Sequence, residues 1–270
     1  MTHCKVPIRA NRAHTRDCWC MEVHAPAIAA QAAPGQFVHV RCGSGYTPLL
    51  RRPFSIHWCH GETLAILYQI VGPGTTQLAA LSPGDTLDLL GPLGHGFTIP
   101  ADRSTAVLVG GGMGIAPLQF LAEHLLHRHC VPRVVVIYGA STVKNLVCYE
   151  SLQRLNLDLF VATEDGTLGR CGTVIDCFKA ELPGLRRRGT RCYGCGPVKM
   201  LHQLVRVADS AGLECEVALE EMMACGVGAC RGCTVLTHSG YQRVCTEGPV
   251  FPANEIAWTA AGVPTGGVPT

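Results

Sequence analysis

The sequence has few charged residues and almost no imbalance between the two signs of charge. Asp, Glu, Lys and Arg make up 16% of the 270 residues, and 22 Lys and Arg against 20 Asp and Glu give a formal net charge of +2. A chain this close to neutrality lacks the basic surface that nucleic acid or an anionic membrane attracts, so we expect neither as a partner. Hydrophobic residues at 47% argue against a disordered chain.

The sequence also lacks a hydrophobic segment suited to secretion or to a membrane. The amino terminus, from Met1 to Lys5, has no apolar signal-peptide core. The uncharged stretch 104–122 contains four glycines and Pro117, which spoil a membrane-spanning helix. We therefore expect a soluble, cytoplasmic protein. Thiols stay reduced in that compartment, so cysteine clusters indicate metal or redox chemistry rather than disulfides.

The first part of the chain, residues 1–101, is typical of an antiparallel β-barrel. Short strands are expected at 36–40, 63–68 and 85–90, and Pro-Gly turns stand at 34–35 and 83–84. Short strands separated by such turns favour a small barrel. The length of the whole chain suggests about two domains, so a change of pattern is expected further on.

The pattern changes at residue 102, where buried strands begin to alternate with helices. Strands are expected at 105–109, 133–138, 157–162, 190–194 and 215–219, with helices between them at about 115–129, 143–155, 173–182 and 198–210. This alternation predicts a parallel sheet covered on both faces over residues 102–219. Residues 220–252 are rich in Cys and Gly and are expected to form a small irregular module, and 253–270 a flexible tail.

Four cysteines in the small module carry the strongest chemical signal. Cys225, Cys230, Cys233 and Cys245 have the spacing C-x4-C-x2-C-x11-C. Four thiolates can hold two irons, and C-x4-C-x2-C is the plant-type 2Fe–2S signature. The glycines between them allow backbone N–H groups to approach sulfur. The alternatives are a structural zinc site, which more often has paired C-x2-4-C knuckles, and unlinked buried cysteines.

A glycine-rich turn between a strand and a helix is the second signal. Gly110, Gly111, Gly112 and Gly114 follow the strand at 105–109, and Pro117 suits the first helical turn. The N–H groups and the dipole of such a helix start favour a pyrophosphate. Pro117 replaces the third glycine of the dinucleotide fingerprint, and no acidic residue ends the second strand, so a tight turn without a ligand is the alternative.

The third signal is a pair of polar motifs in the barrel. Arg51-Arg52-Pro53-Phe54-Ser55 and Gly72-Pro73-Gly74-Thr75 combine arginine, hydroxyls and glycine N–H groups that can hold a flavin or its diphosphate. Two arginines on a barrel rim can equally be a solvated face. Cys192 and Cys195 could form a redox dithiol, but their place in and after a predicted strand favours buried thiols, as we expect for most other cysteines.

Together these motifs resemble the ferredoxin-NADP-reductase superfamily and, within it, the family of electron-transfer subunits of dihydroorotate dehydrogenase B. The resemblance spans about residues 5–252 and also includes Gly91-Pro92-Leu93-Gly94-His95-Gly96-Phe97, Tyr193-Gly194-Cys195-Gly196-Pro197, Glu220-Glu221-Met222-Met223-Ala224-Cys225 and Gly248-Pro249-Val250-Phe251. It implies a flavin-binding barrel, a nucleotide-binding α/β domain and a C-terminal iron–sulfur module, in that order.

The resemblance also implies a position for each cofactor. FAD would be held by Arg52, Pro53, Phe54, Ser55, Leu67, Tyr68, Gln69, Gly74 and Thr75; NAD(H) by Gly110, Gly111, Gly112, Gly114, Cys195, Gly196 and Pro197; and a 2Fe–2S cluster by Cys225, Cys230, Cys233 and Cys245. Gln69 departs from the family, where a basic residue is common. Many relatives place an arginine within 139–142, and its absence here favours NAD over NADP.

The family implies an electron-transfer function with no catalytic residue in this chain. Electrons would move between NAD(H), FAD and 2Fe–2S and an FMN-containing catalytic subunit that interconverts dihydroorotate and orotate in pyrimidine biosynthesis. Two copies of each subunit would form a heterotetramer. The main rivals are a subunit of a ferredoxin:NADP transhydrogenase or of a hydrogenase. A non-enzymatic 2Fe–2S sensor is a rival from another class, against which the flavin motifs argue.

Overall fold

The computed structural model describes residues 1–43, 45–100, 105–128, 131–186 and 189–259. The predicted boundary at 101–102 therefore lies outside the described residues. Within these ranges, no helix is both long enough and apolar enough to cross a membrane.

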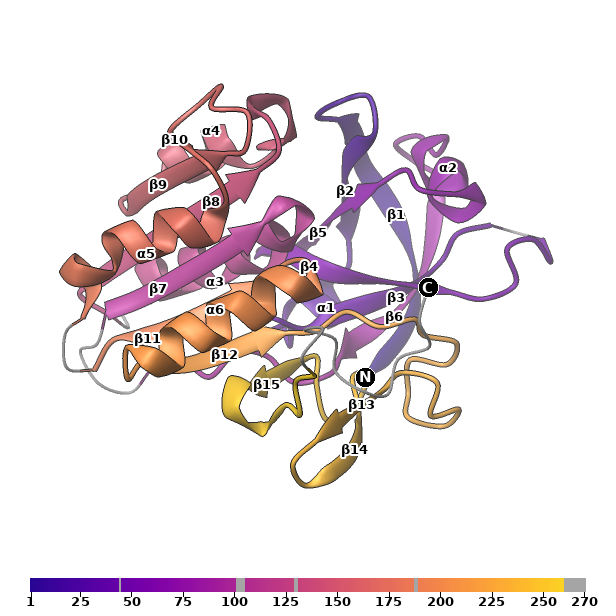
Figure 1. The fold of residues 1–270 in the computed structure, drawn as a ribbon. Helices are drawn as coiled ribbons and strands as arrows, with labels where there is room; N and C mark the ends of the chain where they lie inside the picture. Colours follow the sequence, from indigo (N-terminus) through magenta and orange to yellow (C-terminus); the bar gives the residue numbers. More distant parts are fainter. Residues whose placement is uncertain (44, 101–104, 129–130, 187–188, 260–270) are drawn as a thin grey trace.

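The amino-terminal part is a closed antiparallel barrel, as the sequence predicted (Figure 1). Its strands follow the order β1-β2-β5-β4-β3-β6 around the barrel. Their side chains alternate between the barrel interior and the outside, and Val38, Ile56 and Leu89 are among those that fill the interior. The strands are β1 (Thr2–Ala13), β2 (Cys18–His24), β3 (Phe37–Arg41), β4 (Arg52–His60), β5 (Thr63–Gln69) and β6 (Thr86–Leu93), with short helices α1 (Pro26–Ala29) and α2 (Pro73–Ala79).

The second part is a seven-stranded sheet with the order β10-β9-β8-β7-β11-β12-β15, parallel except for its last strand. Helix α3 lies between the sheet and the barrel, where His57 of β4 donates to the Ala116 carbonyl at 3.1 Å. Helices α5 and α6 cover the opposite face (Figure 1). The elements are β7 (Thr105–Gly111), η1 (Gly112–Gly114), α3 (Ile115–His127), β8 (Arg133–Ala140), η2 (Val143–Asn145), α4 (Tyr149–Gln153), β9 (Asp158–Thr163), β10 (Arg170–Cys171), α5 (Val174–Leu185), β11 (Arg191–Cys195), α6 (Val198–Ser210) and β12 (Glu214–Ala218).

One helix predicted for this part was wrong in its extent. The segment 143–155 is not one helix but the short turn η2 followed by α4. Leu146 interrupts it with a non-helical backbone (φ −85°, ψ 64°). Its side chain, like that of Cys148, is buried in the core between sheet and barrel. Burial of these two side chains therefore overrides the local preference for helix.

The C-terminal part is more regular than the sequence suggested. Strands β13 (Thr234–Thr237) and β14 (Gly240–Arg243) form a hairpin, and β15 (Val250–Pro252) pairs antiparallel with β12. The apolar side chains of this part share one core with Phe37 of the barrel and Val217 of β12. The three parts therefore pack as one body around a common junction.

The tail also differs from the expectation at its start. Residues 253–255 form the turn η3, and Ile256 is buried and bridges to Thr237. Residues 260–270 of the predicted flexible tail lie outside the described residues.

Candidate functional site

The cysteine-rich loop directs backbone N–H groups at its sulfur atoms. The N–H groups of Val227 and Cys230 donate to Cys225 Sγ at 3.5 and 3.4 Å. Gly228 N–H donates to Cys245 Sγ at 3.2 Å, and Gly232 N–H donates to Cys230 Sγ at 3.4 Å. Amide donors around thiolates are the surroundings that stabilise an iron–sulfur cluster and tune its potential.

The four cysteines are arranged as two pairs. The thiols of Cys225 and Cys230 interact with each other, and so do those of Cys233 and Cys245. Within the part of the chain that the structure describes, no three or more metal-ligating side chains converge on one point. A single zinc ion needs four ligands around one centre, whereas two irons can each take one pair. Four cysteines surrounded by amide donors therefore fit a two-iron cluster.

Cys225 and Cys245 differ in how readily they lose protons. Burial alone would raise the pKa of Cys225, but the N–H groups of Cys230 and Val227 outweigh it and lower that pKa to about 6. Burial and the hydrogen bond with Cys233 raise the pKa of Cys245 to about 12. Cys225 thus offers a thiolate at neutral pH, whereas a metal bound at Cys245 would displace a proton from it.

An ion pair behind the loop holds its backbone in place. Arg243 Nη1 donates to the Gly228 carbonyl at 2.9 Å. Glu247 accepts from the backbone N–H of Arg243 and from its guanidinium, which lowers the pKa of Glu247 to about 2. Gly228 has a φ of +81°, which glycine adopts without strain. Arg243 and Glu247 were missed in the sequence, where their i,i+4 spacing was the available signal.

A second candidate site lies where two predicted nucleotide-binding loops meet. Gly110 at the end of β7 pairs in register with Cys195 at the end of β11. After β7, the chain adds β8 and β9 on one side of β7 and then adds β11 on the opposite side of β7. The direction in which strands are added therefore reverses between β7 and β11. In open parallel sheets, ligands bind at such a switch point beyond the carboxyl ends of the strands.

The glycines at this switch point allow the two loops to approach closely. A Cβ atom on Gly114 would lie 2.3 Å from the Cys195 carbonyl oxygen, and one on Gly111 would lie 2.4 Å from Met200 Sδ. Gly112 has a φ of +54° and open space beside it. The structure thus brings together the predicted residues 110–114 and 195–197 at the start of α3, and the N–H groups of a helix start favour a pyrophosphate.

Glu220 at the carboxyl end of β12 is a residue of this region that the motifs did not single out as a site. The residue is exposed to solvent, but the protein around its carboxyl group keeps water away from that group, and this desolvation raises the pKa of the carboxyl. Cys195 is fully buried, and burial, with the Glu220 charge in addition, raises the pKa of its thiol well above the usual value. Cys195 therefore stays a protonated thiol, which agrees with the expectation of a buried thiol rather than a dithiol redox pair.

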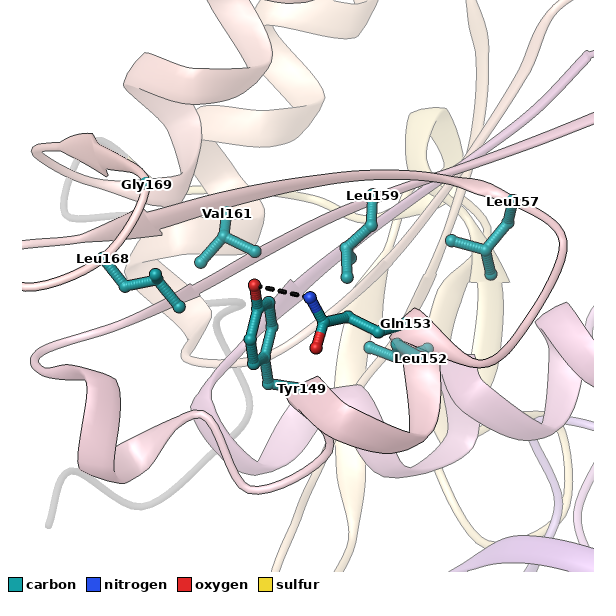
Figure 2. A pocket seen from close by; sticks show the side chains of 8 residues that line it. All are labelled: Tyr149, Leu152, Gln153, Leu157, Leu159, Val161, Leu168 and Gly169. Atoms are coloured by element: carbon teal, nitrogen blue, oxygen red, sulfur yellow. Dashed lines mark hydrogen bonds between the residues drawn. The ribbon is translucent and has the colours of Figure 1, made fainter.

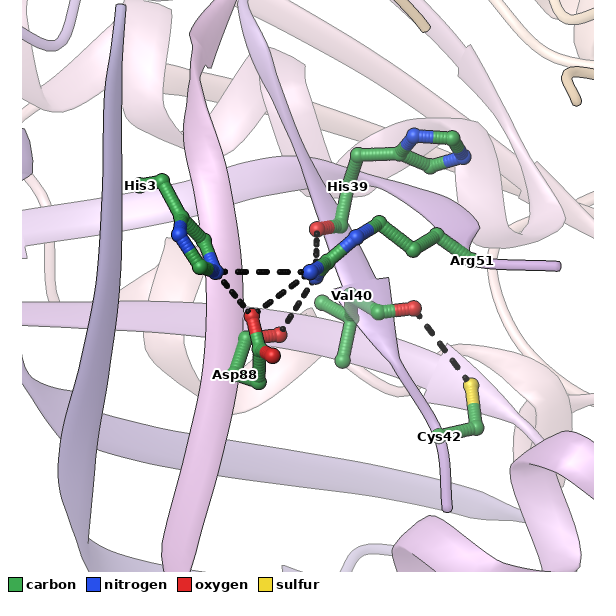
Figure 3. A network of polar contacts seen from close by, with 6 residues as sticks. All are labelled: His3, His39, Val40, Cys42, Arg51 and Asp88. Atoms are coloured by element: carbon green, nitrogen blue, oxygen red, sulfur yellow. Dashed lines mark hydrogen bonds and ion pairs between the residues drawn. The ribbon is translucent and has the colours of Figure 1, made fainter. Parts of the chain in front are cut away.

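The two barrel arginines have different surroundings. Arg51 Nη2 donates to Asp88 Oδ1 at 2.7 Å, and Arg51 Nη1 to the Asp88 carbonyl at 3.1 Å, so this side chain links the residue before β4 to β6 (Figure 3). Burial alone would raise the pKa of Asp88, but Arg51 and His3 together lower it. Arg52 donates only to the carbonyls of Leu50 and Arg51, and no carboxylate among the described residues pairs with it. A half-exposed, unpaired guanidinium fits a phosphate of FAD.

The other residues predicted to hold FAD lie on the paired strands β4 and β5 and at the start of α2. Pro53, Phe54 and Ser55 are half-buried on β4. Thr75 Oγ1 accepts from Val71 N–H at 2.9 Å and shapes the turn before Gly74. On β5, Gln69 is exposed and Leu67 faces the core between the barrel and the sheet.

The position of Tyr68 differs from what a flavin-lining residue requires. Its side chain is buried in the barrel, and its hydroxyl donates to Asn11 Oδ1 at 2.9 Å. The alternation of β5 places it inward, between the outward Leu67 and Gln69. Only the backbone of Tyr68 is therefore available to a ligand outside the barrel.

A pocket of about 340 Å³ lies elsewhere, between α4 and β9 (Figure 2). Leu159 and Val161 of β9 point into it, and Gln153 Nε2 donates to the Tyr149 hydroxyl at 2.8 Å across its floor. None of the predicted cofactor residues lines it. We therefore assign neither the flavin nor the cluster to this pocket.

Comparison with known proteins agrees with this geometry. A family profile described as the iron–sulfur cluster binding domain of dihydroorotate dehydrogenase B matches residues 220–257, and an oxidoreductase NAD-binding domain matches residues 108–206. The dihydroorotate dehydrogenase B (NAD(+)) electron transfer subunit of Desulforamulus reducens is 42% identical over 88% of this chain and 92% of its own. The chain belongs to this family. The electron transfer subunit of Fusobacterium nucleatum is 36% identical over 89% of the chain and 93% of its own.

Solved structures extend the likeness of this electron transfer subunit to the wider reductase fold. The NADH-dependent reduced ferredoxin-NADP oxidoreductase structure, studied for flavin-based electron bifurcation, superposes with a TM-score of 0.84 at 28% identity, over 94% of this chain and 90% of the other. A ferredoxin NADP+ reductase from Neisseria gonorrhoeae, with bound FAD and NADP, superposes with a TM-score of 0.66 at 20% identity, over 78% and 92%. The barrel followed by a parallel sheet is thus the shared architecture.

Proposed function

We propose that this electron transfer subunit passes electrons between NAD(H), FAD and a 2Fe–2S cluster, to or from a catalytic subunit that interconverts dihydroorotate and orotate. The observation that carries the proposal is the cysteine loop, with two thiol pairs and four N–H···S contacts. We assign FAD to residues 1–101, NAD(H) to 102–219 and the cluster to 220–252. When bound, FAD supplies the conversion between the two-electron chemistry of nicotinamide and the one-electron chemistry of the cluster.

The protein's own residues bind and orient these groups. Arg52 would hold a phosphate of FAD while Pro53 and Ser55 support the flavin from β4. The loop 110–114 and residues 195–197 would hold NAD(H) at the switch point of the sheet. Buried Cys195 keeps its proton, so it packs against the nucleotide site without adding charge.

The partner is proposed to be an FMN-containing catalytic subunit, with two copies of each chain in the complex. Support comes from the family name, which designates an electron transfer subunit. The rival is a partner that handles ferredoxin, which the likeness to the ferredoxin-NADP oxidoreductase supports. The two candidate partners differ in the substrate that the partner binds and converts. The cofactors of this chain are the same for both.

The composition of the purified protein tests the proposal directly. We expect about one FAD, two irons and two acid-labile sulfides per chain, and bleaching of both chromophores by NADH under anaerobic conditions. A co-purifying FMN protein in equal amount, active on dihydroorotate, is expected when the native complex is isolated. One zinc without sulfide would refute the cluster, and a ferredoxin-specific partner would support the rival.

A second prediction concerns the choice of nucleotide. A 2′-phosphate requires a cation, and the loop after β8 offers Ser141 and Thr142 but no arginine, with Lys144 as the cation close by in sequence. Arg186 donates to the Ser210 carbonyl at the far end of α6, away from the carboxyl ends of the strands. One charged hydrogen bond contributes about 1.5–3 kcal/mol, so NADH should exceed NADPH in kcat/KM by roughly ten- to a hundredfold. Steady-state rates with an artificial acceptor measure the ratio, and equal values would contradict it.

A further inference from the structure

His39 lies at the junction of the flavin strand and the cluster loop. It belongs to β3, where Val38 and Val40 point into the barrel while Phe37 packs outside, in the core of the cluster module. Because side chains alternate along a strand, His39 faces the same way as Phe37, toward the cluster module. Its cross-strand neighbour on β4 is Pro53, one of the proposed flavin residues.

The imidazole of His39 is fully buried without a hydrogen-bond partner. Its exposed fraction is 0%, and neither Nδ1 nor Nε2 makes a hydrogen bond of normal geometry to the described residues. Burial lowers the pKa of the ring, and the nearby backbones of Cys225 and Arg51 only partly oppose that shift. In Figure 3 its main-chain carbonyl accepts from Arg51, whereas its ring makes no such contact. A buried polar group without a partner costs about 1–3 kcal/mol, and natural proteins satisfy nearly all such groups. The polypeptide therefore leaves the ring without a well-formed hydrogen bond, with the backbone of Cys225 among its nearest polar neighbours.

The Nδ1 edge of the ring faces the cluster loop. A Cβ atom added to Gly226 would lie 2.6 Å from His39 Nδ1, with Cε1 and Cγ at 3.1 Å. Gly226 follows Cys225, the cysteine that already receives two backbone N–H groups. The ring is thus seated directly against the loop that would carry the cluster, on the barrel side.

We propose that His39 is a positioning residue for the 2Fe–2S cluster, seating the loop at Gly226 and supplying a hydrogen-bond donor to the cluster site from the barrel side. This inference rests on the proposed function. A neutral imidazole has one N–H, and sulfur atoms of a negatively charged cluster are acceptors that stay in place only when the cluster is bound. The donor stabilises the reduced, more negative cluster, so its loss lowers the cluster potential.

Replacement by phenylalanine separates the polar role from packing. His39→Phe keeps a ring of similar size and removes both nitrogens, so we expect FAD, iron and sulfide contents to stay at wild-type levels. We expect the cluster's midpoint potential to fall enough to shift the one-electron equilibrium between FAD and cluster about tenfold, or about 59 mV. The FAD potential should not change. Redox titration followed by the electron paramagnetic resonance signal of the reduced cluster measures the shift.

Two further variants keep the result decisive. His39→Asn retains a hydrogen-bond donor close to the Nδ1 position, so its cluster potential should lie between those of His39→Phe and the wild type. If His39→Phe binds less iron and sulfide than the wild type, His39→Asn should also recover part of that cluster content. His57→Phe replaces another buried barrel histidine, one that faces α3, and should leave the cluster potential unchanged.

The results that would overturn the inference about His39 differ from those that would overturn the proposed function. An unchanged cluster potential and signal in His39→Phe would overturn the inference, and so would a shift confined to FAD or a loss that His39→Asn does not recover. A wild-type protein without iron and sulfide would overturn the proposed function before any variant is compared.

Discussion

Replacement of Cys230 by alanine is expected to abolish the 2Fe–2S cluster while FAD stays bound. Cys230 is exposed, whereas Cys233 and Cys245 are buried in the core that joins all three parts of the chain. Cys230→Ala therefore removes a ligand without opening a cavity in that core. Changes in outer-shell partners of a metal ligand already cost 10–100-fold in affinity, so loss of a ligand should reduce cluster content by more than about 100-fold.

Iron and sulfide analysis with absorption spectra measures the loss. NADH:dye activity should remain within about threefold of wild type, because the flavin and nucleotide residues lie on other elements. Cys171→Ala, at an exposed cysteine on β10, is the matched control and should keep the full cluster. Loss of FAD together with iron in Cys230→Ala would contradict the separation of the two sites.

Gly114→Ala is expected to disable the nucleotide site almost completely. The added Cβ would lie 2.3 Å from the Cys195 carbonyl oxygen and 2.5 Å from Gly196 N. These are backbone atoms that cannot rotate away, so the loop 110–114 must separate from 195–197. A misplacement of about 1 Å at a reacting site can cost 10²-fold, and we expect kcat/KM for NADH to fall by about that factor or more.

The contents of FAD, iron and sulfide show whether Gly114→Ala acts locally. They should match the wild type, because the barrel and the cysteine loop do not depend on this contact. Gly184→Ala is the matched control, since a Cβ there meets nothing within 4 Å. An NADH-dependent rate within threefold of wild type in Gly114→Ala would place the nucleotide elsewhere.

The main features of the fold could be predicted from the sequence, because the spacing of apolar residues along a segment indicates which of its sides is buried. The short strands with Pro-Gly turns at 34–35 and 83–84 were enough to predict a barrel, and the apolar run of β8 was enough to predict a parallel sheet. The hairpin of β13 and β14 was not predicted, since its strands have four residues each and lie in a segment rich in Cys and Gly. Strand β15 has three residues, and only tertiary pairing with β12 defines it.

The candidate site was predictable where chemistry fixes the spacing, as for the four cysteines. Their division into two pairs was not, because it depends on how the loop folds back on Gly228 and Cys245. His39 and Glu220 were not identified as site residues, since each acquires its surroundings from a distant segment. Strand alternation places Tyr68 inward, a position that was not predicted because the family resemblance had suggested a flavin contact.

The pairing of β12 with β15 has a consequence for how the cluster is assembled. Both ends of the segment 219–249, which holds all four cysteines, are anchored on neighbouring strands of one sheet. Closing a loop of this length costs conformational entropy, and the pairing of β12 with β15 already meets that cost within the folded sheet. Iron and sulfide therefore enter a loop whose ends are already joined, and loading can follow folding rather than drive it.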